Sequence, residues 1–488
     1  MQCRKKTYLG VEQADRTHHL PFFGFSQIIS GMNKTLIVSI SGIRGIFGEG
    51  LDPLVLVSFV AGYSEWCKRE AGSGRPTVVV GRDARVTGEL CQSIVMSTLQ
   101  SCGCDVINAG LATTPTVEMA VLKEGVTGGI ILSASHNPAE WNALKLLNHR
   151  GEFLSSDEGA TVIENSRNPE SAFTTYDKIG AVRHEDYLEY HIDRILELQF
   201  IDMDAIKSRN FKIVVDGVNS VGGIAIPELL RRLGVSDDQI IETNCEPTGI
   251  FAHPAEPLPQ NLVETCQLVA DTGADLGIVV DPDADRLALI QDGGVYFSEE
   301  LTQVAAAKFL WSHVSGPFVT NLSSSRAIDD VGAELGMSVY RSAVGEINVV
   351  EKMHEVGAVL GGEGNGGVIL PDLHHGRDGL VGVAMILQHL VNENISMTEL
   401  RTSLPSYYMV KLKQNIGDMD PDALLDQMAD KYATEQISTI DGVKIDFANS
   451  WVHMRKSNTE PIIRVYAEAN SEADANALGE RFMAELLS

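Results

Sequence analysis

Positive charge is scarce in this chain of 488 residues. Only 38 Lys and Arg residues stand against 66 Asp and Glu residues, so the formal net charge at pH 7 is −28. A nucleic-acid-binding protein needs a basic face, and attraction to an anionic membrane also needs basic residues. The composition therefore argues against both partners. An anionic substrate would have to be held by local Arg, Lys and helix N-termini, against the overall field.

Long apolar runs and paired cysteines are also missing. No apolar run reaches the ~18 residues of a membrane-spanning helix, so we expect no membrane span. Seven cysteines are scattered along the chain, at positions 3, 67, 91, 102, 104, 245 and 266. None shows the C-x-x-C spacing of zinc or thioredoxin motifs. Such cysteines are typical of buried apolar side chains in a reducing compartment, and we expect a cytoplasmic protein.

The length and the order of predicted elements indicate several domains. A chain of this length suggests about three to four domains. Strand-like and helix-like runs alternate through residues 32–200, 201–298 and 299–403, which is the pattern of α/β domains with parallel or mixed sheets. Residues 404–488 predict a smaller α+β domain with an entering strand at 404–413. The predicted fold is thus three similar α/β domains and a distinct C-terminal domain.

The first 31 residues differ from the rest of the chain. They are basic and then mixed, and their apolar stretch is too short and too broken for a signal peptide. Met32 is followed by a strand-like run over residues 33–40. We therefore expect residues 1–31 to be a disordered extension and Met32 to be the functional start.

A serine-containing loop is the most informative segment. Residues 126–132 predict a buried strand, and the sequence Ser-Ala-Ser-His-Asn-Pro follows from Ser133 to Pro138. Pro138 is suited to the first position of a short helix capped by Asn137. Backbone N–H groups at that helix start would face an anion on Ser135, so this serine is suited to carry phosphate. An ordinary capped loop is the alternative.

An acidic loop follows another apolar strand. Asp281, Asp283 and Asp285 alternate with other residues, and Arg286 comes next. Three carboxylates at this spacing can converge on one hard cation, which prefers oxygen ligands. A solvated acidic turn is the alternative. An EF-hand is excluded, because Arg286 stands at its glycine position and Asp292 at its final glutamate position.

Two further loops carry polar residues. Residues 362–367 read Gly-Glu-Gly-Asn-Gly-Gly and match G-x-G-x-x-G, but a strand-like run and a proline follow where a dinucleotide site needs a helix. The second loop spans residues 455–464 and holds two arginines with a Ser-Asn-Thr run between them, so it offers donors for a phosphate. A capped turn between strands is the alternative there. Its candidate residues are Arg455, Ser457, Asn458, Thr459 and Arg464.

Together these loops resemble the α-D-phosphohexomutase family over residues 35–480. The serine loop is similar to the family pattern T-A-S-H-N-P, with Ser133 in place of threonine. The acidic loop is similar to D-G-D-x-D-R, with Pro282 in place of glycine. The glycine-rich loop is similar to G-E-x-S-G-H, and the last loop to R-x-S-N-T-x-P. The segment around Arg44 is similar to the family's S-G-x-R-G.

The resemblance implies a phosphoserine enzyme with one Mg²⁺ per chain. Ser135 would carry the phosphoryl group, and its phosphate would join the three aspartates as ligands of the ion. Arg286 would help to hold that phosphoryl group, and Arg44 would line the site. Lys145 follows a segment similar to N-G-x-K, and Lys145 and His136 are the candidate acid and base.

The resemblance also predicts how the sugar is held. Glu363 would bind sugar hydroxyls, and the 455–464 loop would hold the phosphate that does not react. Asn365 and Gly367 replace the family's serine and histidine, and this variant resembles archaeal-type phosphoglucosamine mutases. The Asn365 amide can donate and accept, which suits hydroxyl or amino substituents. The turns at 81–83 and 376–379 also match the family and are interpreted as scaffold.

The predicted reaction interconverts hexose 6-phosphate and 1-phosphate through phosphoserine and a bisphosphorylated sugar, with a sugar bisphosphate as activator. Phosphoglucosamine is the preferred substrate class, and phosphomannose or phosphoglucose is the alternative. A non-catalytic sugar-phosphate-binding relative and a phosphatase remain further alternatives. We expect a monomer or a homodimer.

Overall fold

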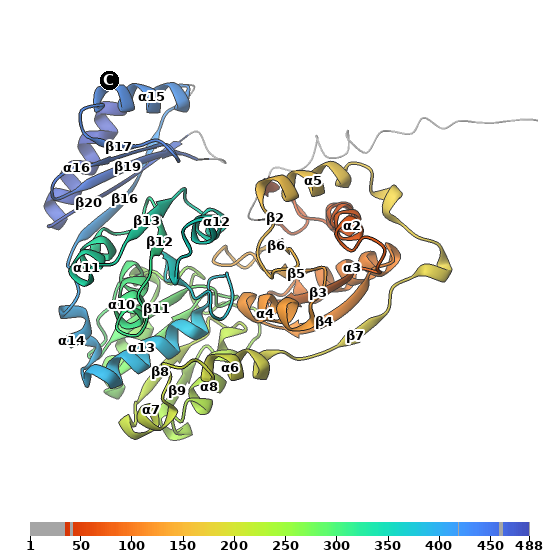
Figure 1. Ribbon diagram of the computed structural model, residues 1–488, viewed down its shortest axis with the longest axis horizontal. Helices are drawn as coiled ribbons and strands as arrows, with labels where there is room; N and C mark the ends of the chain where they lie inside the picture. Colours follow the sequence, from red (N-terminus) through yellow and green to blue (C-terminus); the bar gives the residue numbers. More distant parts are fainter. Residues whose placement is uncertain (1–34, 40–41, 418, 458–461, 488) are drawn as a thin grey trace, which may run out of the picture.

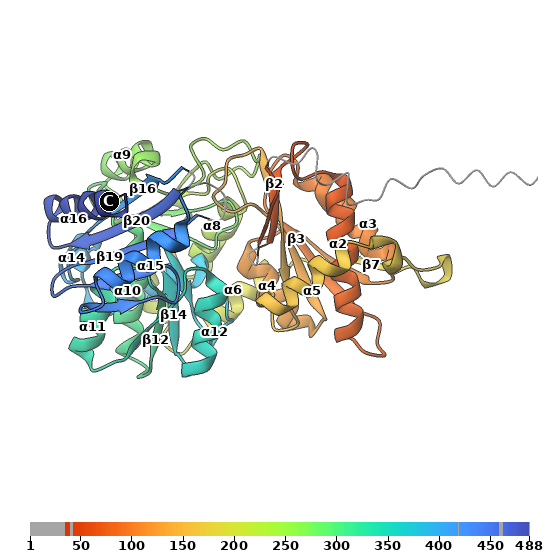
Figure 2. The same ribbon diagram turned by 90° about the horizontal axis from the view of Figure 1, so that it is seen from above.

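The computed structural model describes residues 35–39, 42–417, 419–457 and 462–487. Four β-sheets follow one another along the chain. Figures 1 and 2 show the first sheet and its helices at one end of the molecule and the other three sheets toward the opposite end. The predicted extension at 1–31 and the proposed start at Met32 lie outside the described residues.

The first sheet has seven strands in the order β1-β2-β6-β5-β3-β4-β7. Its strands are β1 (Ile37–Ser39), β2 (Gly42–Ile46), β3 (Thr77–Arg82), β4 (Asp105–Leu111), β5 (Gly128–Leu132), β6 (Trp141–Leu147) and β7 (Val182–His184). The accompanying helices are α2 (Pro53–Glu70), α3 (Gly88–Ser101), α4 (Thr114–Glu124) and α5 (Ser156–Ser166). The next helix, α6 (Leu188–Leu196), packs Ile192 and Ile195 into the core of the following sheets. Helix α2 begins where sequence rules place it, because the Asp52 carboxylate caps the amides of Leu54 and Val55 and Pro53 follows it.

The second and third sheets have four strands each, in the orders β11-β10-β8-β9 and β13-β12-β14-β15. The second comprises β8 (Ile213–Asp216), β9 (Ile240–Thr243), β10 (Leu276–Val280) and β11 (Leu287–Gln291), with α7 (Met203–Arg209), α8 (Gly222–Arg232) and α9 (Val263–Thr272). The third comprises β12 (Phe318–Asn321), β13 (Val339–Ser342), β14 (Leu360–Glu363) and β15 (Gly367–Ile369), with α10 (Glu299–Trp311), α11 (Ala327–Leu335), α12 (Glu346–Val356), α13 (Gly379–Glu393) and α14 (Met397–Thr402). One apolar core is continuous across both sheets and includes Ile213, Phe297, Phe318 and Leu387.

One four-strand unit recurs in these three sheets. Its central strand is β3, β8 or β12, and it pairs in parallel with the next strand in sequence and with the one after that. The third strand of each unit then turns back into an antiparallel partner, giving the hairpins β5–β6, β10–β11 and β14–β15. The central strands β8 and β12 are wholly buried, and β3 is buried except at its two end residues, as expected for strands covered on both faces.

The C-terminal sheet is antiparallel, with the order β16-β20-β19-β18-β17, and has its own apolar core. It comprises β16 (Tyr408–Asn415), β17 (Gln436–Ser438), β18 (Val443–Asp446), β19 (Trp451–Lys456) and β20 (Ile462–Ala469), with α15 (Pro421–Lys431) and α16 (Glu472–Leu486). The predicted fold class, three α/β units with mixed sheets and a smaller α+β domain, is confirmed. None of the described helices is long and apolar enough to span a membrane.

Two local predictions are wrong. No helix begins at Pro138: residues 133–140 form turns that join β5 directly to antiparallel β6. The predicted strand at 404–413 starts four residues late, at Tyr408, because Leu404 is buried in the core of the preceding unit. In both places a contact with a distant part of the chain overrides the local signal.

Candidate active site

Three hairpin loops meet at one cavity. The β5–β6 loop carries Ser135, and the β10–β11 loop carries the three aspartates and Arg286. The β14–β15 loop carries Asn365, two residues after Glu363 at the end of β14. Side chains from all three loops line a cavity of about 200 Å³. The three repeated units therefore bring the same kind of loop, at the carboxyl end of the same strand, to one site, as is usual for open α/β sheets.

Ser135 occupies a strained turn. Its φ is +49°, a left-handed conformation that few residues other than glycine adopt. Its amide donates to Ser133 Oγ at 2.9 Å, and its own Oγ donates to Asp281 Oδ2 at 2.5 Å. The Nδ1 atom of His136 is 3.4 Å from the same hydroxyl. The turn thus aims the hydroxyl at the acidic loop, which is 146 residues away in sequence.

Arg85 holds this turn in place by hydrogen bonds to its carbonyl oxygens. Its guanidinium donates to the carbonyl oxygens of Ser135 and Asn137 at 2.5 and 2.7 Å, and to those of Pro138 and Trp141 at 2.5 and 3.0 Å. Its Nε donates to Asp83 at 3.0 Å, and the Arg85 residue is only 1% exposed. These carbonyls are satisfied by one side chain instead of by a helix, which explains why the predicted helix does not form.

The three aspartates are completely buried and lie beside one lysine. The Nζ atom of Lys145 is 2.6 Å from Asp283 Oδ2 and 3.2 Å from Asp285 Oδ2. Burial alone would lower the pKa of Lys145, but the two carboxylates outweigh it and raise the pKa, so the amine is protonated. Burial and the neighbouring carboxylates raise the pKa of Asp281 well above its ordinary value.

The aspartate loop fits a divalent cation. One ligand oxygen from each of Asp281, Asp283 and Asp285 lies within 4.8 Å of the others. Asp283 Oδ1 and Asp285 Oδ1 are buried and have no hydrogen-bond partner among the residues that the structure describes. Buried carboxylate oxygens without partners are costly, and Mg²⁺ prefers this set of hard oxygen ligands. These residues could therefore hold the ion that the sequence predicts.

Two arginines offer unpaired donors to the cavity. Arg44 and Arg286 both line it, and the Nε atom of each is buried without a hydrogen-bond partner within the described part of the chain. Burial and the proximity of Arg286 lower the pKa of Arg44. The same two influences lower the pKa of His136 well below its usual value, so its imidazole is neutral. A phosphate in this cavity would supply the acceptors that both guanidinium groups lack.

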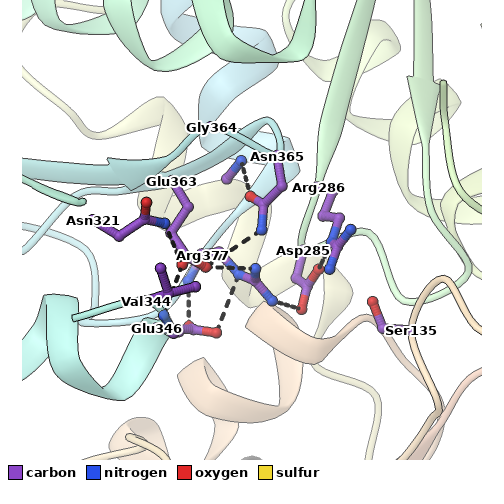
Figure 3. Close-up of polar contacts among 12 residues, drawn as sticks. Ser135, Asp285, Arg286, Asn321, Val344, Glu346, Glu363, Gly364, Asn365 and Arg377 are labelled. Atoms are coloured by element: carbon purple, nitrogen blue, oxygen red, sulfur yellow. Dashed lines mark hydrogen bonds and ion pairs between the residues drawn. The ribbon is translucent and has the colours of Figure 1, made fainter. Parts of the chain in front are cut away.

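Glu363 accepts hydrogen bonds from four donors. Its Oε1 atom accepts from Asn321 Nδ2 at 2.8 Å and from the Gly345 amide at 3.2 Å, and its Oε2 atom accepts from Arg377 at 2.8 Å. Asn365 Nδ2 lies 3.4 Å from the same Oε2 atom. Figure 3 shows this group with Arg377 at its centre. Both predicted sugar-binding residues therefore line the cavity.

Arg377 is the residue that the sequence interpretation missed. The 376–379 turn was interpreted as scaffold, yet Arg377 lines the cavity and donates to Asp285 at 2.7 Å while it holds Glu363. It therefore links the acidic loop to the glycine-rich loop. A side chain at Gly367 would come within 2.3 Å of Arg377 Cδ. The glycine that replaces the family's histidine thus leaves space for this arginine. Gly367 and the arginine of the 376–379 turn together are the sequence features that could have identified Arg377 as a site residue.

The predicted phosphate loop lies on the C-terminal sheet. Arg455 on β19 and Arg464 on β20 are directly opposite each other. Arg455 donates to Asp441 Oδ2 at 3.1 Å, and the same oxygen accepts from the amide of Val344, which lines the cavity. Arg455 and Arg464 do not themselves line the cavity, and the amide of Ser457 donates to the carbonyl of Ile462 at 3.0 Å. Asn458 and Thr459 lie outside the described residues.

A buried polar network supports the loop that carries Arg377. His374 contacts Asp378 at 3.3 Å and Glu118 at 3.0 Å, and His191 contacts Asp378 at 2.9 Å. Burial would lower the pKa of His374, but its two acidic partners raise it to about 10. Burial raises the pKa of Glu118. The folded state therefore binds protons at His374 and Glu118 more tightly than the unfolded chain does. At Asp378 burial would raise the pKa, but the two histidines outweigh it and lower the pKa.

We expect the thermal stability to fall as the pH rises from 7 to 10. Stabilisation from a histidine with a raised pKa is complete below its unfolded pKa of ~6.5, and is lost as the pH rises through about 10. The raised pKa of Glu118 acts in the same direction. For one proton the slope is at most about 1.4 kcal/mol per pH unit. Scanning calorimetry should show that the thermal stability of His374→Gln depends less steeply on pH than that of the wild type.

His184→Gln is the control for this prediction, because His184 is exposed and its ring makes a 3.2 Å hydrogen bond with Asn108, away from the buried network. It should keep the wild-type pH dependence. An equally steep decline in His374→Gln would show that other groups cause it.

Comparison with known proteins agrees with this architecture. The four domain models of phosphoglucomutase/phosphomannomutase match residues 36–172 (domain I), 189–294 (domain II), 298–408 (domain III) and 410–485 (C-terminal domain). Three α/β units of one topology contribute Ser135, Arg286 and Glu363 to the lining of one cavity. Buried aspartates of the second unit contact the lining residues Ser135 and Arg377, and this arrangement defines the same class of protein. The chain belongs to the phosphoglucomutase/phosphomannomutase family.

Three individual proteins show how similar this chain is to known members of the family. A phosphoglucomutase/phosphomannomutase of Thermococcus kodakarensis is 36% identical over 453 residues, covering 91% of this chain and 98% of the relative. A phosphoglucosamine/phosphogalactosamine mutase of Sulfurisphaera tokodaii is 33% identical over 455 residues, covering 90% and 96%. The crystal structure of a family member from Burkholderia thailandensis superposes with a TM-score of 0.80 at 25% identity, covering 92% of this chain and 98% of the other. The homologues are mutases, so the family supports an isomerase.

Proposed function

We propose that this protein is a phosphohexomutase that moves a phosphoryl group between the 1- and 6-positions of a hexose through Ser135, with phosphoglucosamine as the preferred substrate. The observation that carries the proposal is the hydrogen bond from Ser135 Oγ to Asp281 at 2.5 Å, within a cavity lined by unpaired arginine donors. A nucleophile, a cation site and anion donors together are what phosphoryl transfer needs.

The proposed reaction has two transfers. In the first, a sugar hydroxyl attacks the phosphoryl group on Ser135, the new O–P bond forms and the Ser135 Oγ–P bond breaks. The sugar is then a bisphosphate, which reorients in the cavity so that its other phosphoryl group faces Ser135. In the second transfer Ser135 Oγ takes the other phosphoryl group back. Arg44 and Arg286 donate hydrogen bonds to the transferring group, which is where negative charge develops.

Lys145 and His136 have complementary protonation states for the proton transfers. Lys145 is protonated between two aspartates, so it can give a proton to the Ser135 oxygen as the phosphoryl group leaves. His136 is neutral and lies beside the serine, so it can accept the proton of the attacking hydroxyl. The roles reverse in the second transfer.

Asp281, Asp283 and Asp285 would hold one Mg²⁺, with a phosphate oxygen on Ser135 as a further ligand. The bound ion neutralises negative charge on the transferring group. The chain's own contribution is to keep the carboxylates close together: Thr114 donates to Asp283 at 2.6 Å, and Arg377 donates to Asp285.

The substrate preference rests on the acidic side of the cavity. Glu346 and Glu363 line it together with Asn365, and the 2-amino group of glucosamine is a cation that would be attracted by these carboxylates. The name of the Sulfurisphaera relative supports the same choice, whereas that of the Thermococcus relative supports phosphoglucose or phosphomannose. Arg455, Ser457, Asn458, Thr459 and Arg464 are the proposed grip for the non-reacting phosphate, which would fix the sugar without touching the reacting oxygen.

A mutase assay tests this proposal. Purified protein with Mg²⁺ and a catalytic amount of sugar bisphosphate is given the 1-phosphates of glucosamine, glucose and mannose. Fastest turnover of the glucosamine compound is expected. A preference for glucose or mannose would overturn the substrate but keep the mechanism. No turnover of any sugar would favour a binding protein, and net release of phosphate would favour a phosphatase.

Replacement of Asp281 by asparagine should weaken Mg²⁺ binding by at least about 100-fold, because loss of an outer partner of a metal ligand already costs 10–100-fold. Titration of activity with Mg²⁺ measures the change. Glu256→Gln is the matched control, since Glu256 lies 3.8 Å from Arg286 at the edge of the site and is not among the proposed ligands. Equal Mg²⁺ requirements in both variants would contradict the proposed metal site.

A further inference from the structure

A second group of metal-binding side chains lies outside this cavity. It consists of Glu152 from the turn after β6, His354 on α12 and His375 from the loop after β15. One ligand atom from each lies within 4.8 Å of the other two. We propose that these three residues bind a divalent transition-metal ion, best matched by Zn²⁺. The ion would link the unit that contains the first sheet to the unit that contains the third. This proposal does not depend on the proposed function.

The distances are close to those of a tetrahedral site. The Oε1 atom of Glu152 is 2.7 Å from His354 Nε2 and 3.9 Å from His375 Nδ1. Zinc bonds to nitrogen and oxygen of about 2.0–2.2 Å place neighbouring ligand atoms roughly 3.3 Å apart. The observed separations lie on either side of that value. The two imidazole rings are stacked with centroids 4.2 Å apart, and each presents one ring nitrogen to the same Glu152 oxygen.

The carboxylate is held in the way metal ligands usually are. Arg150 donates to Glu152 Oε2 at 2.8 Å, and the Glu152 amide donates to Asn148 Oδ1 at 3.3 Å. These bonds fix the side chain and leave Oε1 directed at the histidines. Such outer partners orient a ligand and raise its affinity for the ion.

The donor set and the space select the ion. Imidazole nitrogen suits zinc and similar transition metals, whereas Mg²⁺ prefers oxygen, so this site and the aspartate loop would bind different ions. Beside the three side chains lies a cavity of about 50 Å³, which has room for water. Three protein ligands and one water make a complete zinc site.

The other histidine cluster does not offer the same chemistry. In that buried network, both ring nitrogens of His191 are already engaged, one with Thr116 at 3.0 Å and one with Asp378 at 2.9 Å. Both ring nitrogens of His374 face carboxylates as well. By contrast, the side chains of His354 and His375 are 43% and 27% exposed, so an ion from solvent can reach them.

Helix α12 joins the proposed zinc site to the cavity that contains Ser135. Phe153, Glu346 and Ile347 line both cavities, and Glu346 accepts from the amide of Arg377 at 2.8 Å. Binding would therefore hold the C-terminal turn of α12, which carries His354, against the first sheet's unit. It would also raise the thermal stability of the folded protein, as any ligand of the native state does.

Zinc titration of metal-free protein tests the proposal. Calorimetry is carried out with Mg²⁺ in excess, so that the aspartate site is saturated, and the melting temperature is recorded in parallel. One equivalent of Zn²⁺ should bind and raise the melting temperature. His354→Ala and His375→Ala should each weaken binding by at least about 10-fold and abolish the shift.

His149→Ala is the matched control, because His149 is exposed, lies in the same turn as Glu152 and is not one of the proposed ligands. It should bind Zn²⁺ like the wild type, and so should Asp281→Asn, which separates this site from the catalytic one. His375→Gln provides a second variant if the alanine form unfolds. Absence of Zn²⁺ binding in the wild type, or unchanged binding in the His354 and His375 variants, would overturn the proposal.

Discussion

Replacement of Ser135 by alanine is expected to abolish mutase turnover with every hexose phosphate, by at least about 10⁴-fold. The variant loses the oxygen that forms and breaks the bond to phosphorus, and removal of a nucleophile from a working site has effects of this size or larger. Its folding should be intact, since the hydroxyl donates only to Asp281 at the open cavity. Initial rates with the 1-phosphates of glucosamine, glucose and mannose measure the loss.

Ser133 provides the control for this experiment, because it lies in the same loop and its hydroxyl accepts from the Ser135 amide at 2.9 Å. Ser133→Ala should lower kcat by about 10–100-fold through a misplaced nucleophile. Ser133→Thr keeps the acceptor and should be nearly as active as the wild type. Residual turnover in Ser135→Ala equal to that of Ser133→Ala would show that Ser135 is not the phosphoryl carrier.

Replacement of Arg85 by methionine is expected to destabilise the protein by about 3–5 kcal/mol. Arg85 is 1% exposed, and its loss leaves the Asp83 carboxylate buried without its cation and four carbonyl oxygens without their donor. The turn at Ser135 has a positive φ that the surroundings must impose, so activity should fall as well. Thermal unfolding and initial rates measure the two effects.

The double variant Asp83→Asn/Arg85→Met separates charge from loop support. Removing the unpaired carboxylate should recover part of the stability but little of the activity, because the carbonyls of the loop stay unsupported. Arg75→Met is the surface control: Arg75 pairs with Asp105 at an exposed position and should cost less than about 1 kcal/mol. A stable and fully active Arg85→Met would contradict the role given to this arginine.

The α/β units could be predicted because their strands are continuous apolar runs bounded by turn residues. The run from Leu276 to Val280 is an example: every residue is buried, and the acidic loop begins directly after it. Such runs need both faces of the sheet covered, which implies helices on either side. The alternation of strands and helices therefore carried the fold class, although it did not show that the three sheets share one strand order.

The helix predicted at Pro138 shows where local signals fail. Asn137 and Pro138 have the residue types of a helix start, but Arg85, more than 50 residues earlier, binds the carbonyls of both. A side chain from the loop between β3 and α3 thus competes with the backbone bonds of a helix. Nothing in the sequence around Pro138 records that contact.

The residue types of the candidate site were readable from the sequence, because a serine beside a predicted anion site and alternating carboxylates each have a characteristic chemistry, and the family resemblance pointed to Glu363. Their relations were decided by the tertiary structure. Folding brings Ser135 to 2.5 Å from Asp281, and it places Arg377 between Asp285 and Glu363. It also sets the charges: a lysine between two aspartates is protonated and a histidine beside arginines is neutral. Proton affinity depends on neighbours in space, so only the fold could fix which group gives a proton and which accepts one.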